Sequence, residues 1–529
     1  MSLTAHAWEL RAPEEGDGEA KTARCHVSLL VDAPQRSPAD LCLVIDVSGS
    51  MQMPAVLKDQ ESAVLSILDI VSHSCRTVLQ SLSPDDRLAI VTYSDQAQVV
   101  LPLTCMDAQG QGEAEAAVQK LRADGQTNLW QGLETALELF RTAPDHGPAR
   151  RAAVPAALVL TDGVPNVEPS GGHLQALRNY RERNGGKLPC TVHTFGFSSD
   201  LDSKLLDALA AGGGGGFVFI PDAGFVGTAL VNCTAGALAA GGRNARLQLS
   251  LGDEVSLEGV LGYQLEEDGS LDLGSVQLGQ RKDMILDFKY SSSASELCRM
   301  SVSYDGAEGE VTLEETSSLP GLDPPDADGT YQSLRLETFE VIQKILGLEA
   351  LADAQREVEH FIERLKEAKA GSDDARLDGL LEDVQGQVSE AVSREDWYRS
   401  WGVHYLRSLA RAHLGQVCNN FKDPGVQCYG GEIFREVRDV ADEIFLKLPA
   451  ANPAIRSHVE TLTALGFSEE EVQRALEYAY DDVEMAATYL MEGLPAYRPG
   501  LHPGRGHAPG SPPAPRTVDM AAYYDAAGG

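Results

Sequence analysis

Three turns in the chain carry the small, oxygen-bearing side chains that bind hard cations. The first turn, DVSGS at residues 46–50, follows an apolar strand and precedes a helix. The second, DGQTNL at residues 124–129, lies where a helix begins, and the third, TDG at residues 161–163, ends another strand. These turns supply five candidate ligands: Asp46, Ser48, Ser50, Thr127 and Asp162. Such an all-oxygen set suits octahedral magnesium that retains water ligands, and it suits zinc or copper poorly.

Each turn also has a simpler interpretation when it is taken alone. The DVSGS turn and Thr127 could each cap a helix, and TDG could be an ordinary turn. An enzymatic alternative is an aspartyl-phosphate hydrolase, which also begins with an aspartate after its first strand. That class normally has a second acid two residues later, where this chain has Ser48. All three turns fall at helix or strand ends of one region, which favours a joint binding site.

The region that must position these turns, residues 39–238, alternates short apolar runs with helical periodicity. This pattern is typical of a doubly wound α/β domain with a parallel sheet covered by helices. We predict strands at 41–46, 87–94, 98–104, 156–162, 190–197 and 217–220, and helices at 56–82, 129–141 and 201–211. The glycine run 212–216 precedes a strand and lacks a following Gly-Lys-Ser/Thr, so we expect a turn and not a phosphate loop.

The order of the three turns closely resembles the metal-ion-dependent adhesion site of von Willebrand factor A domains. The resemblance implies that Ser48, Ser50 and Thr127 ligate Mg²⁺ directly, with Mn²⁺ as a second possible ion. It also implies that Asp46 and Asp162 act directly or through water. In that family an acidic side chain of a partner protein completes the coordination. The site would therefore recognise a protein and would not be catalytic.

The rest of the chain divides into shorter regions by composition. In residues 243–317, short runs of alternating apolar and polar residues are separated by turn residues, which predicts a small β-sandwich. Strands within residues 1–38 would join this sandwich. A Pro/Asp-rich linker leads to an α-helical region at 330–450. Residues 495–529 are rich in Pro and Gly and are expected to be a disordered tail.

Residues 455–492 carry apolar positions at helical spacing and predict a three-helix domain. Ser468 and Glu471 have the spacing of a capping box at the start of the second helix. The segment resembles a ubiquitin-associated domain (UBA domain). The resemblance implies an apolar patch that binds ubiquitin or a ubiquitinated protein, made of Leu465, Gly466, Phe467, Leu490 and Met491.

The segment at residues 419–431, NNFKDPGVQCYGG, resembles one found in intracellular von Willebrand factor A proteins of plants, fungi and protists. Some members of that group carry a RING or U-box and act as ubiquitin ligases. No Cys/His spacing typical of a RING occurs in this sequence. The resemblance therefore implies an adaptor first and a ligase only as the alternative.

Charge and cysteine content narrow the choice of partners. The chain has 43 Lys+Arg against 79 Asp+Glu, a formal net charge of -36, which disfavours nucleic acid and anionic membranes as partners. The 9 cysteines are scattered without C-x-x-C spacing, which favours a reduced, cytoplasmic protein. We therefore expect a magnesium-dependent adaptor that is not an enzyme and that links a protein partner to ubiquitin. The alternative is a component or unusual form of a ubiquitin ligase.

Overall fold

A computed structural model describes residues 1–10, 20–53, 66–143, 153–306, 309–320 and 325–448, together with Val472 and Leu490. The predicted UBA-like domain at 455–492, apart from Val472 and Leu490, and the predicted tail at 495–529 lie outside these described residues. In the described part, no helix is long and apolar enough to cross a membrane.

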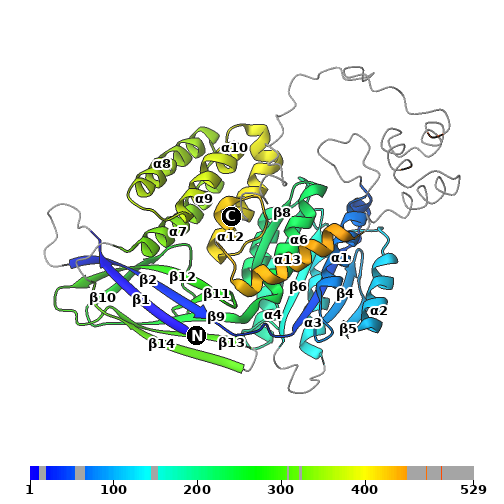
Figure 1. Ribbon diagram of the computed structural model, residues 1–529, viewed down its shortest axis with the longest axis horizontal. Helices are drawn as coiled ribbons and strands as arrows, with labels where there is room; N and C mark the ends of the chain where they lie inside the picture. The colour runs from blue at the N-terminus through cyan, green and yellow to red at the C-terminus, as the bar shows by residue number, and fades with distance from the viewer. Residues whose placement is uncertain are drawn as a thin grey trace. The chain divides into compact units, whose positions relative to one another are not determined.

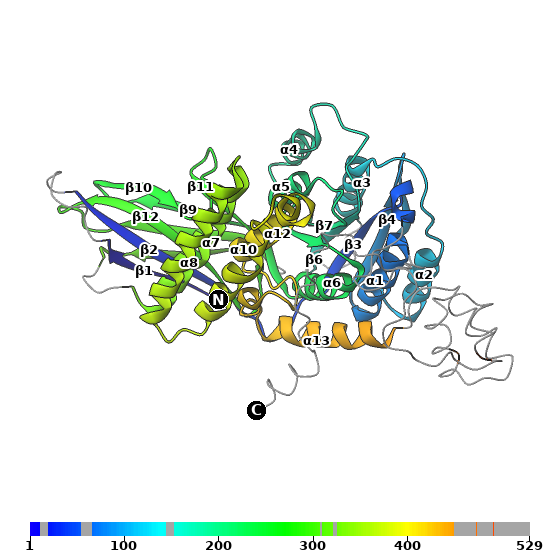
Figure 2. The ribbon, with the colours of Figure 1, turned by 90° about the horizontal axis from the view of Figure 1, so that it is seen from above.

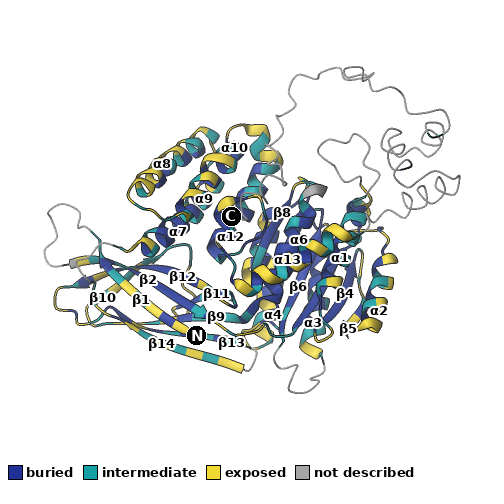
Figure 3. Cartoon of the chain, viewed as in Figure 1, coloured by how far each residue is buried: buried dark blue, intermediate teal, exposed yellow. Residues whose placement is uncertain are grey.

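A six-stranded sheet forms the centre of the α/β domain (Figure 1). Its strands lie in the order β5 (Ala97–Cys105), β4 (Arg87–Tyr93), β3 (Ala39–Asp46), β6 (Val154–Thr161), β7 (Thr191–Phe197) and β8 (Gly214–Ile220). All neighbours pair in parallel except β4 and β5, which are antiparallel. Strands β3 and β4 are buried along their whole length, as Figure 3 shows in dark blue. The prediction of a doubly wound α/β domain is confirmed.

Helices cover both faces of this sheet (Figure 2). One face packs against α3 (Leu129–Thr142), α4 (His173–Arg183) and α5 (Ser203–Gly212). The other carries α1 (Ile67–Ser81) and α6 (Ala223–Leu238), while α2 (Ala108–Gln119) packs beside α1. Helix α1 begins after Ser66, whose side chain forms a capping box with Asp69. The first part of the helix predicted at 56–82 lies outside the described residues.

The glycine run at residues 212–216 differs from the prediction of a simple turn. Gly214 to Gly216 already belong to strand β8. A Cβ atom on Gly215 would lie only 2.2 Å from the carbonyl oxygen of Val192 on the neighbouring strand. Glycine is therefore required there by the close approach of two backbones, and the prediction was wrong for these three residues.

Two four-stranded antiparallel sheets form the sandwich. One has the order β1 (Ser2–Glu9), β2 (Ala20–Val31), β12 (Gln280–Ser291) and β10 (Val255–Val260). The other has the order β11 (Ser270–Gln277), β9 (Ala240–Leu251), β13 (Cys298–Gly306) and β14 (Gly309–Ser317). The N-terminal strands thus enter the sandwich through β2, which pairs with β12 along twelve residue pairs. Arg24 on β2 donates two hydrogen bonds to Asp287 on β12, at 2.7 and 2.8 Å.

The helical region follows the sandwich. Its longer helices are α7 (Ala327–Gly347), α8 (Leu351–Ala370), α9 (Arg376–Asp383), α12 (Val403–Gly415) and α13 (Glu432–Lys447), with the short α10 (Ser389–Ala391) and α11 (Glu395–Trp397) between α9 and α12. Helix α12 packs against α7 and against β8 and α5 of the α/β domain. Helix α13 instead lies across α6 and α1 (Figure 2).

Two aspartates are buried where the helical region packs together. Asp383 at the end of α9 accepts a hydrogen bond from the backbone N–H of Gly425 at 2.9 Å, and its other oxygen has no partner. Burial raises the pKa of Asp383 to about 8. Burial, together with the nearby charge of Asp383, also raises the pKa of Asp423 to about 7. Both carboxyl groups therefore favour the neutral form in the folded chain.

Because Asp383 is buried, we predict that the free energy of unfolding depends on pH and that Asp383→Asn weakens this dependence. An unfolded carboxyl group loses its proton near its ordinary pKa of 3.8, whereas folded Asp383 keeps it up to about pH 8. The free energy of unfolding should therefore fall as pH rises through this window. The wild type should lose melting temperature between about pH 5 and about pH 8, and Asp383→Asn should lose less. The melting temperature of the variant minus that of the wild type should therefore increase over this window. The exposed Asp378→Asn on the same helix is the control, and an equal pH profile for all three proteins would contradict the assignment.

Candidate metal site

The carboxyl end of strand β3 positions the first group of predicted ligands. Asp46 is the last residue of β3 and is fully buried. Its Oδ1 accepts a hydrogen bond from the backbone N–H of Ser48 at 2.8 Å, and its Oδ2 accepts one from the Thr161 hydroxyl at 2.6 Å. The carboxylate is therefore held in one orientation by the turn that follows β3 and by the end of the adjacent strand β6.

The two serines connect Asp46 to Asp162 through a short chain of contacts. Ser48 and Ser50 flank the start of a single 3₁₀ turn, Gly49–Gln52, and their Oγ atoms lie 3.2 Å apart. The Ser50 hydroxyl donates to Oδ1 of Asp162 at 2.8 Å. The other oxygen of Asp162, Oδ2, is buried and has no hydrogen-bond partner. Four of the five predicted residues thus lie in one hydrogen-bonded group.

The fifth residue, Thr127, lies in a loop that is fastened to the other two turns. The backbone N–H of Gly49 donates to the carbonyl of Gly125 at 3.1 Å, which joins the first and second turns. Asn166, after the third turn, accepts from the Thr127 N–H at 2.9 Å through Oδ1 and donates its own N–H to the Thr127 carbonyl at 3.2 Å. Thr127 is buried. These bonds hold its backbone next to the site, although within the described residues no hydrogen bond joins its hydroxyl to the other four predicted residues.

The electrostatics of the site are those of two acids without a counter-charge. Burial, with the charge of nearby Asp46, raises the pKa of Asp162 to about 6. Burial also raises the pKa of Asp46. In the described residues, neither carboxylate forms an ion pair with a Lys or Arg side chain. An unpartnered buried carboxylate oxygen, beside hydroxyl oxygens, fits a small divalent cation.

Two residues that shape the site were not predicted as functional. Thr161 orients Asp46, and Asn166 clamps the loop of Thr127 from both sides. Thr161 belongs to the TDG turn, so its position next to a predicted ligand was a usable signal. Asn166 offered none, because its contact joins residues 39 apart in the sequence.

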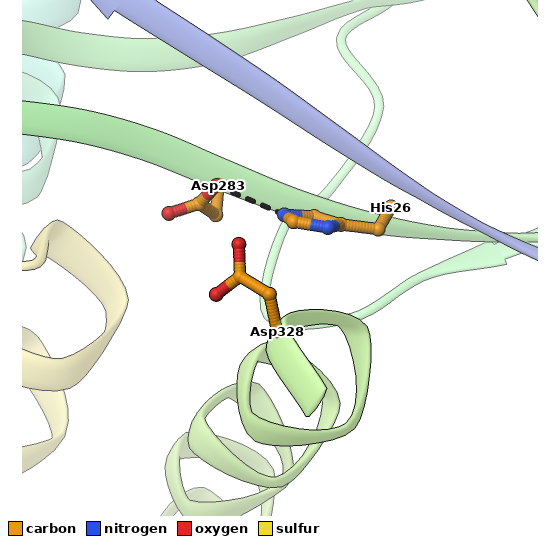
Figure 4. Close-up of side chains that lie close together, drawn as sticks. All are labelled: His26, Asp283 and Asp328. Atoms are coloured by element: carbon orange, nitrogen blue, oxygen red, sulfur yellow. Dashed lines mark hydrogen bonds and ion pairs between the residues drawn. The ribbon is translucent and has the colours of Figure 1, made fainter. Parts of the chain in front are cut away.

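A second group of side chains with metal-ligating chemistry lies at His26, Asp283 and Asp328 (Figure 4). The imidazole Nε2 of His26 lies 2.9 Å from Oδ1 of Asp283. The oxygens of Asp328 accept from Arg281 at 3.0 Å and Arg376 at 2.8 Å. Because these donors already occupy the oxygens, we interpret the group as an ion-pair network that joins the sandwich to α7.

Comparisons with protein families assign three regions of the chain. Residues 40–226 match the von Willebrand factor type A domain, and residues 374–443 match the family described as VWA / Hh protein intein-like. Residues 456–490 match the UBA/TS-N domain. The chain therefore contains a von Willebrand factor type A domain, an intein-like region of that description and a C-terminal UBA domain.

The full-length relatives share only part of their length with this chain. It is 24% identical over 348 residues to the E3 ubiquitin-protein ligase WAV3 of Arabidopsis thaliana, which covers 63% of this chain and 41% of WAV3. It is 28% identical over 189 residues to the uncharacterized protein sll0103 of Synechocystis, with 36% of this chain and 39% of that protein covered. A solved von Willebrand factor type A structure from Catenulispora acidiphila has a TM-score of 0.56 at 18% identity and covers 77% of this chain and 96% of that one. This last likeness concerns the fold.

The clamp formed by Asn166 predicts a measurable contribution to stability. Asn166→Ala removes the acceptor for the Thr127 N–H, and we expect a loss of about 1 kcal/mol in the free energy of unfolding. Asn166→Asp keeps an oxygen at the same place and should lose less. Urea unfolding of the three proteins measures the difference, and equal midpoints for Asn166→Ala and wild type would show that the clamp is dispensable.

Proposed function

We propose that the von Willebrand factor type A domain of this chain binds Mg²⁺ and, through the ion, an acidic side chain of a partner protein. Ser48, Ser50 and Thr127 would ligate the ion directly, and Asp46 and Asp162 would act directly or through water. The unpartnered, buried Oδ2 of Asp162 carries this proposal, since a buried carboxylate oxygen without a donor is costly unless a cation satisfies it.

The residues around the ligands would prepare the site before the ion arrives. The hydroxyl of Thr161 and the backbone N–H of Ser48 occupy one lone pair on each oxygen of Asp46, which fixes the direction of the remaining ones. When bound, the ion supplies positive charge and an open coordination position for a partner's carboxylate. The absence of nitrogen and sulfur ligands from the set favours Mg²⁺, and then Mn²⁺, over zinc.

We further propose that the UBA domain binds ubiquitin or a ubiquitinated protein through Leu465, Gly466, Phe467, Leu490 and Met491. The match at residues 456–490 supports this assignment. Leu490 is helical and only partly buried, which suits a residue at the edge of a contact surface. One chain would then hold a partner at the metal and ubiquitin at the UBA domain, and so act as an adaptor.

We place this adaptor in the cytoplasm. Seven cysteines, among them Cys42, Cys75 and Cys190, are buried thiols. A chain that keeps so many thiols reduced fits a compartment with a reducing glutathione pool.

A second candidate function is that of a component or unusual form of a ubiquitin ligase. The similarity to WAV3, which carries the name of an E3 ubiquitin-protein ligase, favours it. The experiment that separates the two functions is a discharge assay with the full chain and a ubiquitin-charged conjugating enzyme. Transfer of ubiquitin to lysine in the presence of the chain supports the ligase, and transfer at the rate of the enzyme alone supports the adaptor.

The metal assignment predicts a specific loss of binding. Titration calorimetry of the full chain with Mg²⁺ should show one site, and Ser48→Ala/Ser50→Ala should abolish the heat because two direct ligands are removed. Ser170→Ala/Ser199→Ala, two exposed serines of the same domain, is the matched control and should bind as wild type does. Unchanged binding by the Ser48/Ser50 variant would exclude the site.

The ubiquitin assignment predicts an independent loss. We expect weak ubiquitin binding, because so small a patch lies at the low end of interface sizes. Phe467→Ala/Leu490→Ala should abolish the chemical-shift changes that the full chain causes in labelled ubiquitin, whereas Ser48→Ala/Ser50→Ala should preserve them. Unchanged shifts with the Phe467/Leu490 variant would place ubiquitin binding elsewhere.

A further inference from the structure

A cavity of about 680 Å³ lies where the α/β domain, the sandwich and the helical region meet. Its walls come mainly from β8 and from two elements that each contact β8, namely β11 and α12. On the sheet it contacts the first residues of β6, β7 and β8, whereas the candidate metal site lies at the opposite, carboxyl ends of β3 and β6. The volume falls in the range of small-molecule sites, and the cavity is separate from the metal site.

The ammonium group of Lys282 is the main charge buried in the wall of this cavity. Lys282 lies on β12 with 8% of its surface exposed. Its Nζ donates to the backbone carbonyl of Gly415 at 3.2 Å. In the described part of the chain, no carboxylate lies within ion-pair distance of this nitrogen. Burial and the positive charges of Arg335 and Arg411 lower the pKa of Lys282 to about 8, so the group is still mostly charged at neutral pH.

The acids nearest to this ammonium are committed to other partners. Asp283, the next residue, is bonded to His26 at 2.9 Å through one oxygen and to Gln332 at 3.0 Å and Gln416 at 2.8 Å through the other. Asp272 in the cavity wall accepts from Arg181 at 3.1 Å. The positive charge of Lys282 therefore has no dedicated counter-ion.

Glu340 and Glu266, the other acids of the wall, do not neutralise it either. Glu340 accepts from the backbone N–H of Gly262 at 2.8 Å, and Glu266 is exposed to solvent. Arg411, also in the wall, uses only Nε in its ion pair with Asp207, at 2.7 Å. Its Nη groups form no hydrogen bond within the described residues, and its positive charge is near enough to lower the pKa of Lys282.

A buried ammonium without a counter-ion is unfavourable, and the cavity leaves room for one. We propose that this cavity binds a small molecule that carries a phosphate or carboxylate group, with Lys282 and Arg411 as its recognition residues. Both groups offer the several oxygens that an ammonium and a guanidinium can share. The interior thus selects an anion within a chain whose formal net charge is -36.

The test measures the thermal stability of the full chain after chelator treatment, which removes any contribution from the metal site. Inorganic phosphate and succinate are titrated separately against sodium chloride of equal ionic strength. We expect phosphate, succinate or both to raise the melting temperature by about 2 °C or more, with saturation, beyond the effect of chloride. The more effective probe identifies the anionic group, and a response no larger than that of chloride overturns the proposal.

Two variants and one control locate the effect. Lys282→Met should raise the melting temperature without added anion, because an uncompensated buried charge is removed, and should abolish the response to phosphate or succinate. Lys289→Met, an exposed lysine on the same strand, should respond as wild type does. If Lys282→Met keeps the anion response, the proposal is wrong.

A second variant tests the cavity without removing the charge. Gly216→Val fits the backbone, because a Cβ atom there has no neighbour closer than 3.9 Å, and its side chain would occupy part of the cavity. It should weaken the anion response of a chain whose Lys282 is intact. A folded Gly216→Val protein with a full response would place the anion outside this cavity.

Discussion

The hydrogen bond from Thr161 to Asp46 is the contact on which the geometry of the candidate metal site depends. It joins the carboxyl ends of β3 and β6, two adjacent parallel strands, at the point where each strand leaves the sheet. Because Asp46 and Thr161 are fully buried, neither side chain can exchange this bond for water. The two turns that follow them therefore start from fixed positions. The bond between Asp46 and Thr161 therefore also fixes where Ser48, Ser50 and Asp162 lie.

Buried hydrogen bonds also join the α/β domain to the helical region. Helix α12 is shared: its Ser408 hydroxyl is bonded to the backbone of Phe217 and Phe219 on β8, while its apolar side chains enter the core of the helical region. His404 on the same helix lies 2.7 Å from the Ser203 hydroxyl at the start of α5. The α/β domain and the helical region consequently share buried polar contacts and not only a surface. Because hydrogen bonds depend on direction, these contacts fix how the α/β domain and the helical region are oriented relative to each other.

Periodicity predicted the sheet well and the connections between regions poorly. The runs around Leu43, Val91 and Leu158 are apolar at every position because these strands are buried on both faces, so their pattern is unmistakable. Helix α13 was predicted as part of the helical region, and only the structure shows that Phe445 packs against Gly227 of α6. No local pattern encodes such a pairing, since it joins the amphipathic helix α13 to a mostly apolar helix far away in the sequence.

The candidate metal site likewise contains residues that the sequence predicts and others that only the structure reveals. Its acids and hydroxyls stand at strand and helix ends, where sequence reasoning can find them, and Asp46, Ser48, Ser50 and Asp162 do lie together. Asn166 and the cavity at Lys282 could not be predicted, because each depends on which distant backbone comes to lie beside it. Lys282 lies in a run of four polar residues, 280–283, which gives no local signal that its side chain is buried.

The pairing of β2 with β12 also constrains how the chain is made. Arg24 and Asp287 are 263 residues apart, so β2 leaves the ribosome long before its partner strand exists. At about 5–20 residues per second the wait is on the order of tens of seconds. The whole α/β domain is synthesised in that interval and can fold first, while β2 has only β1 as a neighbouring strand. Cys25, Val27 and Leu29, all fully buried at the end, would meanwhile be exposed to solvent. Until β12 is made, β2 therefore has an open edge, and such an edge favours aggregation of the nascent chain.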